Sequence, residues 1–295
     1  MKKSTLFAGI PVFMIVLLFT VNAFSQKLYI NASVGYGLGT HKSFFQMSSG
    51  NSYIYYDTVY DNNKVELKRI SFGQGANFEI GVGSYIGKHI AIEINGFYQM
   101  SQKNEINYKD VINIVNVFKV QITQEKIMKG KMFGIRPNFI LRGGGDKIKP
   151  FVKIGCVIGF GKIVEEDNII IYNPIPGYLP REDIESVLTY KRQLNLGYSA
   201  AIGFDVFVGE GTRFFAECAY TAINYVPISA EYTEYKYMGK DELENLAPGE
   251  RYYEFVDEYT TAENDNENTP TKSLKYPFSF SNIGVRVGFV FSILK

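Results

Sequence analysis

Eight segments of this chain alternate, with a period of two residues, between large apolar side chains and small or charged ones. In the segment 194–206, for example, Leu196, Tyr198 and Ile202 share one parity, whereas Gly203 and Asp205 lie on the other. A β-strand points successive side chains to opposite faces, and a helix cannot produce this period. The chain is therefore all-β, with strands predicted at 27–39, 70–83, 90–99, 133–142, 152–160, 194–206, 214–221 and 282–291.

The connections between these segments alternate in length. Short turns are predicted at 87–89, 143–148 and 209–212, and long loops at 40–69, 101–127, 162–192 and 226–277. In an antiparallel sheet this alternation places all the long loops at one end and both chain termini at the other. Short periplasmic turns and long external loops are typical of outer-membrane barrels.

The chemistry of the two parities indicates which face is turned inward. One parity is rich in glycine and charge, which suits a narrow lumen, and the other is apolar, which suits lipid. A soluble barrel of the lipocalin kind would turn its apolar face inward around a ligand. We therefore expect an eight-stranded antiparallel up-and-down transmembrane β-barrel with four long extracellular loops. Its expected place is the bacterial outer membrane, with both termini periplasmic.

The N-terminus has the layout of a secretory signal. Lys2 and Lys3 precede an apolar run at 6–21, and small residues flank Phe24 before Gln26. A retained membrane anchor is the alternative, but Pro11 interrupts the run. We expect a signal peptide at 1–25 to be cleaved and a single barrel domain to occupy 26–295.

The final segment, Asn282 to Phe291, reads NIGVRVGFVF and carries a family resemblance. With the alternation before it, the chain resembles the small outer-membrane β-barrels of the Bacteroidota type. Relatives of this kind are the barrel domain of outer membrane protein A and the PorT-like barrels of type IX secretion. The resemblance implies a barrel in the outer membrane and, for the PorT-like members, a part in a secretion or envelope assembly. It implies no catalytic residue.

Ionisable residues occur on the parity predicted to face the lumen. An eight-stranded barrel is just wide enough inside for side chains to fill it, so these charges can reach one another. Isolated buried charges are costly, so a plugging ion-pair network is the preferred interpretation, and a proton or ion path is the alternative. The predicted network contains Glu79, Glu93, Arg136, Lys153, Asp205, Glu217 and Arg286.

Tyrosines concentrate in the first and fourth long loops. They could form a partner-binding surface or pack the loops together, because tyrosine suits both roles. The candidates are Tyr53, Tyr55, Tyr56, Tyr232, Tyr235, Tyr237, Tyr252 and Tyr253. The fourth loop is also acidic, but it lacks the ligand spacing of a calcium loop, so no metal site is predicted.

Other functions have little support in the sequence. The formal charge of +1 becomes about −1 once Lys2 and Lys3 are removed, which argues against nucleic-acid binding. The two histidines, His41 and His89, lie in no catalytic motif, so we predict no catalytic residue, no cofactor and no enzyme. Cys156 and Cys218 fall on the lipid-facing parity with one strand between them, about 10 Å apart, and should remain free thiols.

The preferred function is a non-enzymatic outer-membrane barrel whose long surface loops contact a partner or ligand. Outer-membrane lipid and lipopolysaccharide surround it, and an extracellular protein or glycan is a possible loop partner. Three alternatives stay open: a component of a secretion or envelope assembly, a narrow channel, and a lipid-modifying enzyme.

Overall fold

A computed structural model describes residues 28–40, 43–44, 69–114, 118–145, 147–174, 177–191, 194–260, 264 and 266–293. The predicted signal peptide at 1–25 and most of the first long loop, with Tyr53, Tyr55 and Tyr56, lie outside these residues.

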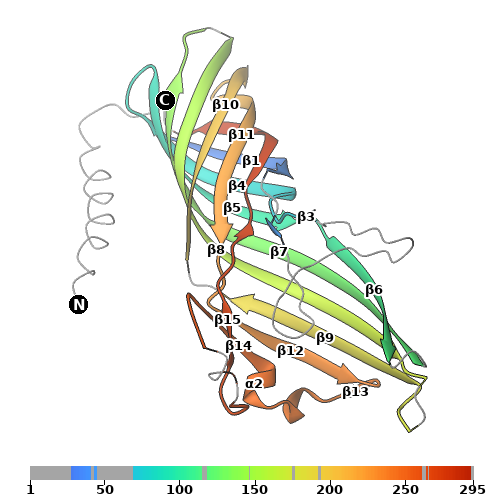
Figure 1. Ribbon diagram of the computed structural model, residues 1–295. Coiled ribbons are helices and arrows are strands. Elements are labelled where there is room, and N and C mark those ends of the chain that lie inside the picture. Colours follow the sequence, from blue (N-terminus) through green and yellow to red (C-terminus); the bar gives the residue numbers. More distant parts are fainter. Residues whose placement is uncertain are drawn as a thin grey trace, which may run out of the picture.

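Eight antiparallel strands form a closed barrel, which confirms the predicted fold class (Figure 1). Closure is complete because β1 pairs with β4 on one side and with β17 on the other, where Val34 faces Val287. The barrel strands follow one another in chain order around the wall. They are β1 (Leu28–Gly39), β4 (Gly75–Tyr85), β5 (Ile90–Ser101), β7 (Phe118–Arg142), β8 (Ile148–Tyr172), β10 (Asn195–Gly209), β11 (Thr212–Tyr225) and β17 (Asn282–Ser292).

One side of the wall continues far beyond the barrel. Strands β7 and β8 have 25 residues each, and their outer halves belong to a sheet extension that leads away from the barrel in Figure 1. The extension also holds β6 (Asn104–Ile114), β9 (Arg181–Lys191), β12 (Ser229–Tyr237), β13 (Lys240–Asp241), β14 (Tyr252–Val256) and β15 (Thr271–Leu274). The segments 101–127 and 162–192, predicted as long loops, are instead largely hydrogen-bonded strands. The predicted loop at 226–277 contains the shorter strands β12 to β15.

The remaining elements are short. β2 (Ser43–Phe44) pairs with β3 (Arg69–Ile70), and β16 (Phe278–Ser279) pairs with the end of β11. A 3-10 turn, η2 (Leu243–Asn245), and one helical turn, α2 (Pro248–Arg251), lie between β13 and β14. In the part of the chain that the structure describes, no helix is long and apolar enough to span a bilayer.

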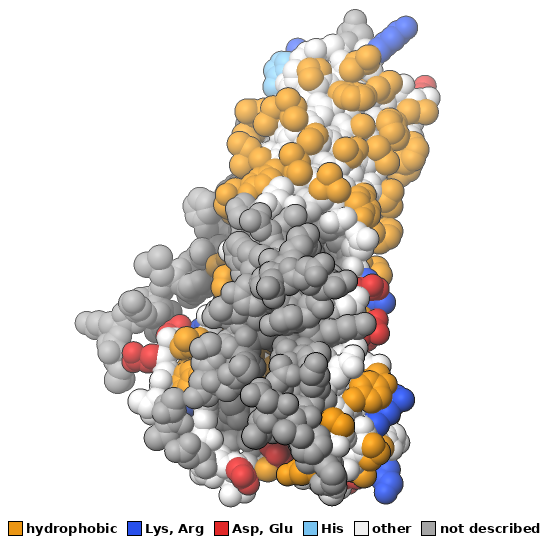
Figure 2. Space-filling view, turned by 45° about the vertical axis from the view of Figure 1, so that its right-hand side comes forward, with side chains coloured by type: hydrophobic (Ala, Val, Ile, Leu, Met, Phe, Trp, Pro, Cys, Tyr) orange, Lys and Arg blue, Asp and Glu red, His pale blue; other side chains and the backbone are white. Residues whose placement is uncertain are grey.

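The outer surface of the barrel carries a belt of exposed apolar side chains (Figure 2). Ile80, Ile202 and Val285, each at least 60 % exposed, come from three different strands of the wall. On β1 the belt runs from Leu28 to Leu38, which is about 33 Å along the strand and about 25 Å in height for strands tilted by about 40°. That height matches the hydrocarbon band of transmembrane barrels. A water-soluble surface rarely exposes an apolar patch of this extent.

The predicted strand at 70–83 begins too early. Its alternation implied that Ile70 and Phe72 face lipid, but both are buried, with Phe72 fully enclosed. The chain bends at residues 72–74, and β4 begins only at Gly75, whose φ of 147° is open mainly to glycine. The bend shifts the segment before Gly75 off the wall and over the mouth of the barrel.

The two cysteines are free and exposed on the outer surface, as predicted. Strand β10 separates them, since Cys156 pairs with Tyr198 and Cys218 pairs with Ile202. Those partners are four residues apart along β10, so the two Cα atoms are farther from each other than the predicted distance of about 10 Å and well beyond disulfide reach.

Candidate functional site in the lumen of the barrel

The centre of the lumen contains a compact group of buried ionic side chains. Glu79, from β4, forms ion pairs with both Arg136 from β7 and Arg286 from β17. Arg286 also contacts Glu217 from β11, with 2.7 Å between Nε and Oε1. Side chains from opposite parts of the wall therefore meet across the barrel.

Lys153, on β8, joins this group to a third carboxylate. Its Nζ atom lies 3.0 Å from Glu93 Oε1 and 3.3 Å from Glu217 Oε2. Asn95 links the acids from the side, because its amide donates to Glu93 at 2.8 Å and to Glu79 at 3.2 Å. We call Glu79, Glu93, Glu217, Arg136, Lys153 and Arg286 the central network.

The central network balances three carboxylates against three cations. Arg136 is only 1 % exposed, and its guanidinium lies 4.9 Å from the ring centre of Phe97. Glycine on a neighbouring strand provides the necessary room: Gly35 pairs with Arg286, and a Cβ atom on Gly35 would lie 2.5 Å from Arg286 Cγ. The glycine-rich parity of the sequence is thus the space into which the long charged side chains extend.

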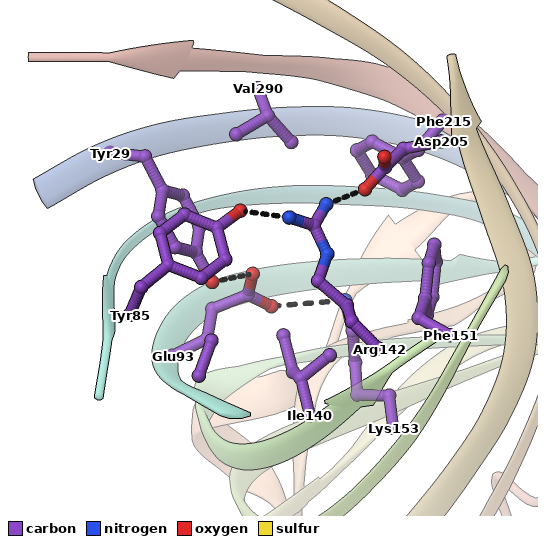
Figure 3. Close-up of a pocket in the computed structure, with 11 residues that line it drawn as sticks. Tyr29, Tyr85, Glu93, Ile140, Arg142, Phe151, Lys153, Asp205, Phe215 and Val290 are labelled. Carbon is purple, nitrogen blue, oxygen red and sulfur yellow. Dashed lines mark hydrogen bonds and ion pairs between the residues drawn. The ribbon is translucent and has the colours of Figure 1, made fainter. Parts of the chain in front are cut away.

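A second ionic group lies toward the short turns (Figure 3). Asp205 forms ion pairs with Arg142 and Arg213, and Tyr85 accepts a hydrogen bond of 2.7 Å from Arg142 through its hydroxyl. Tyr29 donates its hydroxyl to Glu93 at 3.2 Å, and its ring centre lies 4.9 Å from that of Tyr85, so it connects the two groups. Tyr29, Tyr85, Arg142 and Asp205 line a cavity of about 20 Å³, which has room for about one water molecule.

The opposite end of the lumen is filled by aromatic side chains. Phe72 and Phe280 stack with ring centres 5.4 Å apart, and both are fully buried. Beneath them Gln99 donates to the backbone oxygens of Phe72 at 3.1 Å and of Phe280 at 3.3 Å. The segments that precede β4 and β17 therefore close over the last polar layer.

Phe278 connects this aromatic layer to the sheet extension. Its ring lies 5.6 Å from that of Phe72, 5.2 Å from that of Tyr190 and 4.9 Å from that of Tyr276. Tyr190 belongs to β9 and stacks in turn on Phe255 of β14. A continuous apolar core thus runs from the barrel mouth into the extension.

No protein-family profile matches the chain, and no curated protein matches it in sequence. Among solved structures, a major outer membrane protein from Thermus thermophilus is similar over 91 % of this chain and 99 % of that one. The sequence identity is 8 % and the TM-score is 0.32, so this similarity does not assign the chain to a family.

The structure brings six of the seven predicted lumen residues into the central network and places the seventh elsewhere. Asp205 belongs to the group near the short turns. Its partners Arg142 and Arg213 are not among the seven predicted residues, although Arg142 lies on the lumen parity of its strand. Arg213 follows directly after a short turn, where too few residues remain for alternation to show its direction.

The described tyrosines of the predicted partner surface mostly pack against their neighbours. Tyr232 makes edge contacts with Tyr235 at 5.9 Å and with Tyr253 at 6.0 Å. Tyr237 donates its hydroxyl to Glu182 at 3.1 Å. Tyr252 is 36 % exposed and lies beside Arg251. Packing therefore accounts for much of this tyrosine cluster.

The extension has a buried polar cluster of its own. Lys126, on β7, contacts both Glu165 and Asp167 of β8, the latter at 3.1 Å. Gln124 donates to Asp167 at 3.1 Å, and Tyr190 donates to Glu165 at 2.8 Å. Two carboxylates thus share one described ammonium group in a poorly hydrated place.

This cluster predicts a pH dependence of stability. Burial raises the pKa of Asp167 from its ordinary 3.8 to about 6; Glu165 adds to the rise and Lys126 opposes it. Between about pH 6 and pH 4 the folded protein holds a proton that the unfolded chain releases. Stability therefore rises as the pH falls through this window.

Asp167→Asn tests this pH dependence, because the amide cannot ionise. Thermal unfolding followed by circular dichroism should show the variant more stable than the wild type at pH 7.5 and the difference gone near pH 4. Asp257→Asn is the surface control, since the Asp257 side chain is 85 % exposed. A wild type and an Asp167→Asn variant with parallel pH profiles would contradict the assignment.

Proposed function

We propose that this protein is a non-enzymatic barrel of the bacterial outer membrane whose own side chains close the lumen. The observation that carries the proposal is the central network, in which every carboxylate contacts a cation drawn from another strand. A conducting pore needs a hydrated path past its charges. Here three acids and three bases neutralise one another, and aromatic side chains cover them on the side away from the short turns.

The sheet extension is the second part of the proposal. Strands β7 and β8 leave the belt near Phe133 and Phe160 and continue for about twelve residues, which is about 40 Å at 3.3 Å per residue. Hydrogen bonding to β6, β9 and β12 makes this extension a stiff platform. We infer that it stands outside the cell and contacts a partner protein, a glycan or lipopolysaccharide.

Electrical recording tests the closed lumen. Purified protein in a planar bilayer should give no steady conductance, whereas a variant with all six residues of the central network replaced by serine should conduct, because the shorter uncharged side chains admit water. A difference in gel migration between unheated and boiled samples would show that both proteins are folded barrels. Steady wild-type conductance would reject the closed lumen and favour a narrow channel.

Epitope labelling tests location and orientation. The turn after Gly177 lies at the far tip of the extension, and Tyr178 beside it is 66 % exposed. A tag inserted there should bind antibody on intact cells, whereas a tag at the short turn near Gly144 should bind only after the envelope is permeabilised. The reverse pattern would overturn the orientation, and no envelope signal from either tag would overturn the location.

A further inference from the structure

Three lysines stand side by side on the outer surface where the extension leaves the belt. Lys131 of β7 is directly opposite Lys162 of β8, and Lys162 is directly opposite Lys191 of β9. Lys131 has the same parity as the lipid-facing Phe133, and Lys162 has the same parity as Phe160. All three side chains therefore project outward from neighbouring strands at one level of the wall. We call them the lysine row.

The lysine row is unfavourable by itself. Like charges in directly opposed cross-strand positions repel one another, with Cβ atoms only about 5 Å apart. Glu231 lies 2.6 Å from Lys191 and compensates that end of the row. Within the described residues no carboxylate forms an ion pair with Lys131 or Lys162. The arrangement leaves two adjacent ammonium groups for an external anion.

The position of the row relative to the belt indicates what kind of anion fits. Two residues closer to the middle of the belt, Phe133 and Phe160 face each other across the same pair of strands, with ring centres 5.7 Å apart. Both rings are exposed, as is Met100 on β5, which pairs with Lys131. Apolar chains lying against the belt would thus end at these rings, with their polar head at the level of the lysines.

We propose that the lysine row binds the phosphate monoester of a lipid whose acyl chains lie along the belt. A monoester carries a charge of about −1.5 to −2 and three acceptor oxygens, which matches two or three converging ammonium groups better than the single charge of a diester does. The inference deepens the proposed function and rests on it, since it requires that the belt be embedded in a membrane.

Native mass spectrometry of the purified protein in detergent tests the site with defined lipids. Bisphosphorylated lipid A should bind, whereas lipid A without phosphates and phosphatidylglycerol should each bind about tenfold more weakly, as expected for the loss of a charged hydrogen bond. Inorganic phosphate at the same concentration should not displace lipid A, because it lacks the acyl contacts. Equal displacement would indicate a site for a free anion and overturn the lipid assignment.

The double variant Lys131→Gln with Lys162→Gln should weaken lipid A binding about tenfold or more. Without lipid it should be at least as stable as the wild type, because the repulsion is removed. The matched control is Lys88→Gln with Lys147→Gln, which removes two exposed lysines from the short turns and should leave binding unchanged. Equal affinity of both double variants would overturn the site.

Reconstitution into liposomes distinguishes failure of the lipid site from failure of the membrane barrel. Protein that inserts but binds lipid A without regard to its phosphates or to the lysine row refutes only this inference. Protein that fails to insert refutes the proposed membrane barrel, and the lipid site with it.

Discussion

Arg136→Ala should destabilise the barrel by about 3 to 5 kcal/mol, the usual effect of breaking a buried ion pair. The variant leaves Glu79 with Arg286 as its remaining cation, and Arg286 must already neutralise Glu217. The network then holds three carboxylates and two cations in a place that water hardly reaches. Urea titration of the folded barrel, followed by its heat-sensitive gel mobility, measures the loss.

A double variant separates the buried pair from ordinary loss of contacts. Arg136→Ala with Glu79→Ala should be clearly more stable than the sum of the two single effects predicts, because the excess charge is gone and Arg286 keeps Glu217 as a partner. Lys149→Ala, on β8 near the short turns, removes a cation outside the network and serves as the control. Additive effects of the two network variants would show that water screens these charges, as in an open channel.

Phe278→Ala should lower the unfolding free energy of the sheet extension by about 3 to 5 kcal/mol, as expected for the loss of a fully buried aromatic ring. The ring touches Phe72 over the barrel mouth and Tyr190 and Tyr276 at the base of the extension. Its removal should loosen the extension while the barrel survives. Limited proteolysis should then cut the 177–180 and 238–250 regions much faster than in the wild type.

Tyr178→Ala provides the aromatic control for cleavage at 238–250, since that side chain is 66 % exposed and lies outside this segment, so removing it should leave the cleavage rate there unchanged. If Phe278→Ala also leaves the extension as resistant as the wild type, the apolar core does not hold the extension to the barrel.

The barrel could be predicted from the sequence because a closed wall between lipid and a narrow lumen demands strict alternation. Ile202 and Asp205, three positions apart, already face opposite sides of the wall. The same rule identified six members of the central network. It fails at Phe72, because the chain bends before Gly75, and residues on the two sides of a bend no longer alternate between the same two faces.

The extension could not be predicted in the same way. β9 and β12 carry many charged and polar residues on both faces. The difference in polarity between their alternate positions is therefore smaller than in the strands of the barrel. A register shift between Tyr232 and Glu234 also breaks the period in the middle of β12. The partners of Lys126 and Asp205 depend on which strands are neighbours, and a single sequence does not contain that information.

The central network also bears on the order in which the barrel can assemble. Glu79 and Arg286 are 207 residues apart in the chain, and they meet only when β17 closes the ring against β1. Contacts of such long sequence separation form late, since loop-closure entropy must first be overcome. Until that moment an incomplete barrel holds excess negative charge at Glu79 and Glu217. A truncated or misaligned last strand would leave this charge uncompensated. The ion pairs therefore stabilise only the fully closed barrel in which β17 has the correct register.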